Sequence, residues 1–177
     1  MSKKADEVRG RVVYIDGQST SGDKGQSMSG DCGQSMSGDC GQSIAGDSGQ
    51  SVSGDWGQSI SRDWGRSTSG NRGQSISTSY GQSVSGDCGQ SVGRFSKLLK
   101  TGRAGVCVNY GDNCRWVCTE DTILVLHYQD EESNKFEFRV FEANKFSEHY
   151  NQIASIVSGE IKFWEKTKTK GGIKCLI

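Results

Sequence analysis

Residues 17–96 repeat an eight-residue unit, and this period constrains the fold more than any other feature of the chain. Ten copies follow one another without insertion or deletion, beginning GQSTSGDK and GQSMSGDC. A composition so rich in Gly and Ser is typical of disordered segments, but a disordered segment needs no register. A strict register is instead typical of stacked repeats, in which each unit packs against its neighbours.

Each unit predicts one short strand followed by one tight turn. Gly is first and Ser third in every copy, Gln is second except at Arg66, and the fourth place holds Thr, Met, Ile or Val. Gln-Ser-apolar-Ser has the period of a strand. Gly-Asp-x-Gly is typical of a turn, since Gly permits positive φ and Asp bonds its own backbone. Two units then form one sixteen-residue coil of a flattened β-solenoid with two facing sheets, and ten units form about five coils.

The sequence leaves open which face of the strand points into the solenoid. With the fourth place inside, alternate units form two stacked apolar columns, and the Ser residues face water as flat Ser-x-Ser rows. With the Ser residues inside, the core is very narrow, which would explain why the third place never varies. We favour the first arrangement because it buries more apolar surface. The rows that it exposes include Ser19, Ser21, Ser27, Ser29, Ser51, Ser53, Ser59 and Ser61.

The chain outside the repeat divides into two terminal parts and a connector. Residues 1–16 contain the strand-like segment RVVYID, which we expect to cap the stack, since an uncovered sheet edge pairs with passing strands. Residues 97–105 are a polar and basic connector. Residues 106–177 have the composition of an ordinary globular unit and predict a small α+β C-terminal cap.

Within this cap the residue pattern predicts several strands and one helix. The strands are expected at 105–110, 115–119, 122–128, 136–141 and 161–164, with a tight hairpin turn at 111–113. Phe146, Tyr150, Ile153 and Val157 fall on one stripe at helical spacing. The expected fold class is therefore an all-β solenoid of octapeptide repeats with a small α+β C-terminal cap.

The octad register resembles that of bacterial octapeptide-repeat β-solenoids and, more distantly, the sixteen-residue coils of bacterial ice-nucleation proteins. The Gly-Asp-x-Gly corners and the Ser-x-Ser triplets carry the resemblance, which covers residues 17–96. It implies the solenoid fold and, as an expectation, an ice-binding surface. Ice-nucleating proteins carry Thr-x-Thr at outward positions and an aromatic ladder at one corner. Here Ser replaces Thr, and the aromatic corners are Trp56, Trp64 and Tyr80.

No group of residues in the sequence indicates a catalytic site or a metal site. His127 and His149 lie in a strand-like run and a helix-like stripe, where a structural role is expected. Cys107, Cys114 and Cys118 lack the paired C-x2-C spacing of zinc sites. Turn chemistry already explains the Asp of each unit. We therefore expect no metal, no cofactor and no enzymatic activity.

The eighth place of each unit varies freely and supplies most of the candidate binding residues. Aromatic and Arg side chains gather in the middle of the repeat, a composition typical of the centre of a protein interface. The candidates are Trp56, Trp64, Arg66, Arg72 and Tyr80. The leading hypothesis is a rigid non-enzymatic scaffold that binds a protein partner or a second copy of itself, as in a homodimer. The alternative is ice binding through the Ser-x-Ser rows.

The net charge and the terminal residues predict the cellular location of the protein and the partners that it does not bind. The 21 basic and 21 acidic residues cancel, so no net field attracts nucleic acid or an anionic membrane. The first residues lack the apolar core of a signal peptide, and no apolar run is long enough to cross a membrane. Seven cysteines without an export signal are typical of reduced thiols. We expect a cytoplasmic protein that binds neither nucleic acid nor membrane.

Overall fold

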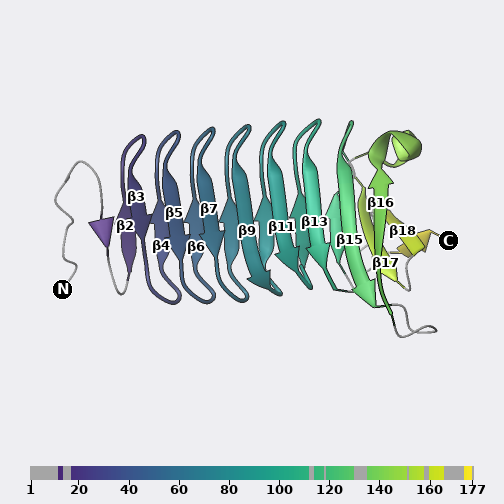
Figure 1. Cartoon of the computed structure of the whole chain (residues 1–177), viewed down its shortest axis with the longest axis horizontal. Helices are drawn as coiled ribbons and strands as arrows, with labels where there is room; N and C mark the ends of the chain where they lie inside the picture. Colours follow the sequence, from purple (N-terminus) through teal and green to yellow (C-terminus); the bar gives the residue numbers. More distant parts are fainter. Residues whose placement is uncertain are drawn as a thin grey trace.

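The computed structural model describes residues 12–13, 17–111, 114–117, 119–129, 135–150, 152–157, 160–165 and 174–176. They form a β-solenoid of about seven turns, in which successive strands alternate between two facing sheets (Figure 1). Strands sixteen residues apart pair in parallel and in register through the repeat, for example Gln42 with Gln58. The predicted solenoid and its sixteen-residue coil are therefore confirmed.

Sheet A has nine strands and sheet B has ten. Sheet A contains β1 (Val12–Val13), β3 (Gln26–Met28), β5 (Gln42–Ala45), β7 (Gln58–Ser61), β9 (Gln74–Ser79), β11 (Gln90–Arg94), β13 (Val106–Tyr110), β15 (Ile123–Gln129) and β16 (Phe136–Glu142). Sheet B contains β2 (Gln18–Thr20), β4 (Gln34–Met36), β6 (Gln50–Val52), β8 (Arg66–Thr68), β10 (Gln82–Val84), β12 (Leu98–Lys100), β14 (Arg115–Val117), β17 (Ile153–Val157), β18 (Glu160–Glu165) and β19 (Lys174–Leu176). Of the cap strand expected at 11–16, only β1 lies within the described residues.

The interior of the repeat is lined by serine, so the arrangement that we favoured from the sequence is wrong. The third-place serines are 0–1 % exposed, whereas Met36 and Val52 at the fourth place are about 40 % exposed. The two sheets lie so close that Ser27 in β3 donates to the Oγ of Ser19 in β2 at 2.8 Å. Between such closely spaced sheets a methionine or an isoleucine does not fit, and steric fit outweighs apolar burial.

Glycines at the first place of every unit and at the sixth place of most units allow the corners and the stacked coils to pack closely. A Cβ on Gly41, a first-place glycine, would lie 2.7 Å from the Cβ of Ser37 and 3.0 Å from the carbonyl oxygen of Gly25. A Cβ on Gly38, a sixth-place glycine, would lie 2.1 Å from Oδ1 of Asp23 in the preceding coil. Both glycines have ordinary φ angles. The sequence predicted that these glycines permit positive φ, and this reason is wrong. Glycine is needed at these two positions because a Cβ would have no space.

The solenoid continues beyond the last regular unit. Residues 97–105, expected to be a connector, contain β12, which pairs in parallel with β10 and β14. Gly102 and Gly105 occupy the places of the sixth and first glycines, since a Cβ on Gly102 would lie 2.0 Å from Oδ1 of Asp87. Residues 97–104 are thus a degenerate unit, KLLKTGRA, in which leucine replaces the third-place serine and Gly105 begins the next unit.

The next strands also belong to the coils and do not form the expected hairpin. β13 pairs in parallel with β11 and β15 in sheet A, while β14 lies in sheet B. The expected turn at 111–113 therefore connects two sheets; residues 112–113 lie outside the described part. The boundary that composition indicated at residue 106 is a change of interior side chains, and the parallel pairing passes through it without a break.

After β15 the chain changes direction and closes the end of the solenoid. β16 pairs antiparallel with β15. In sheet B, β17 pairs antiparallel with β14, β18 with β17, and β19 with β18. The helix expected from the stripe of Phe146, Tyr150, Ile153 and Val157 is wrong. The chain forms a short 3-10 helix, η1 (Ala143–His149), followed by β17. The unpaired edge of β14 offers β17 a ladder of hydrogen bonds, and this tertiary pairing outweighs the local periodicity.

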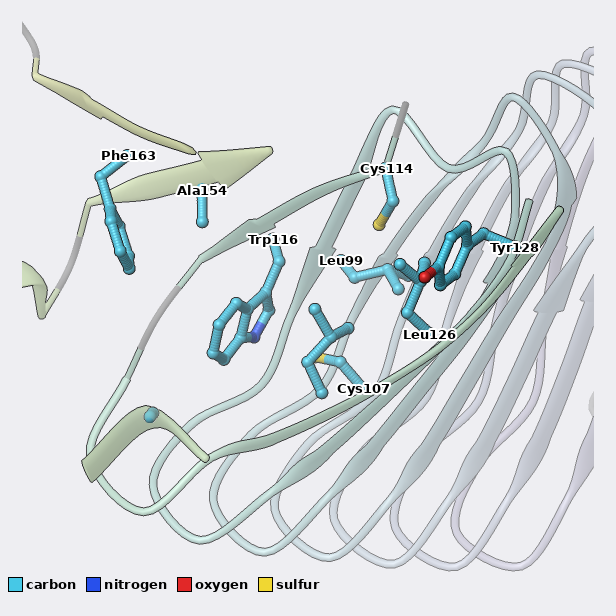
Figure 2. Packing of buried hydrophobic residues seen from close by; sticks show 10 residues of the cluster. Leu99, Cys107, Cys114, Trp116, Leu126, Tyr128, Ala154 and Phe163 are labelled. Carbon is cyan, nitrogen blue, oxygen red and sulfur yellow. The ribbon is translucent and has the colours of Figure 1, made fainter. Parts of the chain in front are cut away.

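A hydrophobic core occupies this C-terminal end (Figure 2). Along sheet B the inward position changes from Ser83 to Leu99 and then to Trp116, and β17 places Ala154 opposite Trp116. Along sheet A it changes from Ser91 to Cys107 and then to Leu124. Large side chains thus fill the last coils and close the serine-lined interior at that end.

The two buried serine rows should respond differently to substitution. Ser67 Oγ donates to the carbonyl of Ser59 at 2.6 Å and accepts from the N–H of Ile76 at 3.1 Å. Ser69 Oγ, at the fifth place, is buried without a partner among the described residues, and Ala45 shows that this place accepts alanine. We expect Ser67→Ala to lower the free energy of unfolding by about 1–2 kcal/mol and Ser69→Ala to leave it unchanged or raise it. Urea denaturation measures both, and equal losses would contradict the distinction.

Candidate interaction surface

The eighth place of nine of the ten units lies at a corner with an unusual backbone conformation. Trp56, Trp64 and Tyr80 have φ of +59°, +62° and +60°, and the N–H of Gly57 donates to the carbonyl of Gly54 to close the turn around Trp56. Positive φ at the third residue of a four-residue turn is the type II arrangement, which favours Gly or Asn. None of the ten units has Gly or Asn at its eighth place, although an L side chain costs about 1–2 kcal/mol in this conformation.

The seventh-place carboxylates hold these corners in register from coil to coil. Asp39 Oδ1 accepts from the N–H of Asp55 at 2.8 Å, and Asp55 Oδ1 accepts from the N–H of Asn71 at 2.6 Å. On the opposite edge Asp63 accepts from the N–H of Ser79 at 3.0 Å and from the hydroxyl of Thr78. The hydrogen bond from Thr78, followed by that from Ser79, lowers the pKa of the Asp63 carboxyl. The corner side chains therefore stand on a rigid backbone.

The structure divides the five candidate residues among three places. Successive corners lie on opposite edges of the flattened solenoid, and corners on the same edge are sixteen residues apart (Figure 1). Trp64 and Tyr80 lie on one edge, and Trp56 and Arg72 lie on the other. Arg66 lies on neither edge, because it is the exposed second residue of its unit and the first residue of β8. The single cluster suggested by their order in the sequence does not form.

Trp64 and Tyr80 belong to a stack of three rings, which we name the aromatic edge: Trp64, Tyr80 and Phe95. The ring centroids of Trp64 and Tyr80 are 4.9 Å apart, and those of Tyr80 and Phe95 are 5.9 Å apart, with the planes within 22° of parallel. The repeat pattern did not identify Phe95, because it is the seventh residue of its unit. A shift in the pairing of β9 and β11 moves the positive-φ corner to Phe95, and the irregular ending GRFS was the available signal.

Basic side chains surround the aromatic edge. Lys97 Nζ lies 4.3 Å from the centre of the Trp64 ring, and the guanidinium of Arg94 lies 5.3 Å from the centre of the Phe95 ring. A hollow of about 680 Å³ lies beside Tyr80 and Phe95. Among the described residues, its wall contains Lys97 and Arg115 and no acidic side chain. The aromatic edge therefore combines the exposed rings of Trp64 and Tyr80 and the half-buried ring of Phe95 with positive charge.

The opposite edge carries a smaller group. The guanidinium of Arg72 lies 4.8 Å from the centre of the Trp56 ring, and the Trp56 side chain is 59 % exposed. The neighbouring corners on this edge are Cys40 and Cys88, which add no further ring. This pair forms a local cation–π contact, and the longer aromatic stack lies on the other edge.

The serine rows expected to face ice lie inside the solenoid. Ser19, Ser27, Ser51 and Ser59 are at most 1 % exposed, and Ser29, Ser53 and Ser61 are also buried. Ser21 is partly exposed as a residue, but its Oγ is buried. The outer faces present the second and fourth places instead, where Gln42 Nε2 donates to Gln58 Oε1 at 3.3 Å. A surface of serine hydroxyls is therefore excluded for these residues.

The cysteines and histidines considered as ligands do not converge. Cys107 and Cys114 are buried, and desolvation raises the pKa of Cys107 to about 12. His127 lies on the outer face of sheet A, where its ring stacks on Phe136 at 5.0 Å. Cys118 lies outside the described residues, and so does the side chain of Cys175. In the part of the chain that is described, no three His, Cys, Asp or Glu residues come together to hold a metal.

Comparison with known proteins gives no further guidance. No protein-family model, curated protein or solved structure matches the chain. Among the described residues, no helix has the length and apolar character needed to cross a membrane. The function is therefore argued from the geometry of the surface.

The Asp63 contact at the corner can be tested by titration. We expect Thr78→Val to raise the pKa of Asp63, because the largest cause of its lowering is the hydrogen bond from the Thr78 hydroxyl. In the wild type, the lowered pKa stabilises the fold at pH above the unfolded-state pKa, and this contribution disappears as the pH falls through the folded-state pKa. Carboxyl NMR titration measures the shift. Thr20→Val, remote from Asp63, is the control, and an unchanged Asp63 pKa in Thr78→Val would contradict the assignment.

Proposed function

We propose that the protein is a non-enzymatic β-solenoid scaffold that binds a protein partner through the aromatic edge. The observation that carries the proposal is the placement of Trp64, Tyr80 and Phe95 at positive-φ corners. The chain uses glycine at two other places in most of its units, yet it keeps large side chains where glycine would relieve strain. Exposed rings that stabilise neither a turn nor a core are the residues that contribute most to protein interfaces.

The rigidity of the corners supports this proposal. Stacking on Tyr80 fixes the Trp64 ring, and the hydrogen bonds of Asp63 fix the backbone beneath the two rings. Side chains that are already ordered lose little conformational entropy when a partner binds. The Trp64 and Tyr80 side chains remain 57 % and 45 % exposed, so a partner has a large apolar area to cover.

The charges around the rings indicate the chemistry of the partner. Lys97, Arg94 and Arg115 contribute three positive charges around the edge and its hollow. Asp63 lies near Arg94 and offsets part of this charge. The complementary surface is a protein segment that combines acidic side chains with an apolar or aromatic residue that packs against Tyr80 and Phe95. Electrostatic complementarity of this kind sets orientation and association rate more than affinity, so binding should weaken as salt is raised.

The double variant Trp64→Ser/Tyr80→Ser tests the aromatic edge. We expect it to lose at least about tenfold in affinity for the partner recovered with the wild type, because interface aromatic residues commonly contribute 2 kcal/mol or more. Its thermal unfolding should stay close to wild type, since both side chains are exposed. Partners are recovered by cross-linking and pull-down, and their affinity is then measured with purified components.

Trp56→Ser on the opposite edge is the matched control. It removes an equally exposed tryptophan at an equivalent corner and should leave the interaction intact. Equal binding by wild type and the double variant would overturn the proposal. Loss in Trp56→Ser alone would move the site to the Trp56–Arg72 edge.

Ice binding stays the second candidate, through a different row from the one expected. The outward fourth places of sheet A, including Ile44, Ile60 and Ile76, stand in register along a flat face beside the bonded Gln row. Such a regular lattice is the observation in favour of this candidate. It predicts thermal hysteresis for the full chain, reduced in Ile44→Lys and retained in Trp64→Ser. Freezing identical to buffer at high protein concentration would exclude it.

A further inference from the structure

We propose that the protein forms a two-fold dimer in which β16 pairs antiparallel with β16 of a second copy. β16 is the terminal strand of sheet A and pairs with β15 along one edge. Within the described residues, no strand pairs with its other edge. This surface lies at the C-terminal end of the solenoid (Figure 1), and its first residue, Phe136, lines the same hollow as Phe95 of the aromatic edge.

The register of β16 on β15 shows which main-chain groups point away from the sheet. The N–H of Ala143 donates to the carbonyl of Thr122 at 2.8 Å, and the register next to it pairs Glu142 with Ile123. In an antiparallel pair, hydrogen-bonded and non-hydrogen-bonded residues alternate. Counting back from Ala143, every second residue bonds to β15, and the residues between them direct their N–H and C=O groups outward. The outward set is Phe136, Phe138, Val140 and Glu142.

Three of these four residues also expose large apolar side chains. Phe136, Phe138 and Val140 are 67 %, 69 % and 62 % exposed, although they belong to a regular strand. Edge strands are commonly protected by shortness, proline, bulges or inward charges. β16 has seven residues, no proline and no shift in its register with β15. Its two inner-face charges, Glu137 and Arg139, have opposite signs, so they disfavour an apolar strand but not an antiparallel copy of β16. An edge of this kind is complementary to another strand, because pairing satisfies the main chain and covers the rings together.

The charges of β16 favour pairing with β16 of a second copy, and they also favour one register of the two strands. Pairing about a two-fold axis at Phe138 places Phe138 opposite Phe138 and Phe136 opposite Val140 on the outer face. On the inner face it places Glu137 of each copy opposite Arg139 of the other. Pairing about Arg139 would instead place two arginines opposite each other, which is unfavourable. The Phe138 register also pairs the outward main-chain groups with one another, as an antiparallel ladder requires.

Tyr128 already holds the two charged residues on one side of the strand. Its hydroxyl donates to Glu137 Oε2 at 3.0 Å, and the guanidinium of Arg139 lies 5.5 Å from the centre of its ring. Tyr128 itself is buried in the C-terminal core (Figure 2). The charges that would meet across the two-fold axis are therefore anchored to the end of the solenoid before association, which reduces the entropy lost on pairing.

Sedimentation velocity of the full chain over a concentration series tests the dimer. We expect a monomer–dimer equilibrium in the wild type and a dissociation constant raised by about tenfold or more in Phe138→Lys, which places two lysines together at the axis. Ile60→Lys introduces the same charge on the outer face of sheet A, far from β16, and should leave the equilibrium unchanged. Circular dichroism confirms that each variant is folded.

A charge exchange tests the register itself. Arg139→Glu alone should weaken the dimer, because each Glu137 then meets a second glutamate. Arg139→Glu combined with Glu137→Arg restores opposite charges across the axis and should recover much of the wild-type association. Hydrogen exchange provides an independent measurement: the amides of Phe136, Phe138 and Val140 should gain protection as concentration rises.

The outcomes separate this proposal from the proposed function. The proposal would be overturned if the wild type stays monomeric at all concentrations and the hydrogen-exchange protection of the β16 amides does not change with concentration. A dimer that is unaffected by Phe138→Lys would also overturn it. A dimer lost in Trp64→Ser/Tyr80→Ser but kept in Phe138→Lys would place self-association at the aromatic edge and also overturn it. Loss in Phe138→Lys and Arg139→Glu, with recovery in the double exchange, supports it.

Discussion

The short distance between the two sheets is the constraint on which the rest of the structure depends. Serine hydroxyls bond from one sheet to the other, as between Ser35 and Ser43 at 3.0 Å, so the interior has no space for a larger side chain. Little apolar surface is buried in the repeat, and the coils depend on main-chain ladders, the serine hydrogen bonds and the Asp bonds at the corners. The glycines answer a separate constraint at the corners, because a Cβ at the first place, or at most of the sixth places, would collide with the same corner or with the preceding coil.

The serine-lined interior contains no hydrophobic core, and the C-terminal part of the chain supplies one at its end of the solenoid. The inward residues grow in size over the last coils, from Ser83 through Leu99 to Trp116. The antiparallel strands then place Ala154 and Phe163 over the end of the stack. Most of the large buried side chains of the described residues lie in this core. The repeat therefore supplies regular length, while the C-terminal core supplies most of the apolar burial.

The sequence predicted the period, the coil and the turn, because each depends on local residue type and spacing. It did not predict the buried face, since a comparison of apolar content takes no account of the space between the sheets. The degenerate unit at 97–104 was missed because its third place is Leu99, although Gly102 and Gly105 kept the spacing of the repeat. The helix expected over 146–157 failed because the edge of β14 pairs with β17. Trp64 and Tyr80 were identified from composition, whereas their separation from Trp56 and their stacking with Phe95 required the fold.

The narrow interior also determines where recognition can occur. Inward places are restricted to small residues and most glycine places cannot change, so substitution is freest at the outward strand places and at the corners. A substitution at one corner alters the surface of one edge only. The neighbouring corners on that edge are sixteen residues away along the chain. Trp64, Tyr80 and Phe95 stack only because they occupy successive corners on one edge. A binding surface can therefore be assembled one corner per coil without altering the serine interior, which is how a highly regular repeat can carry an irregular and specific surface.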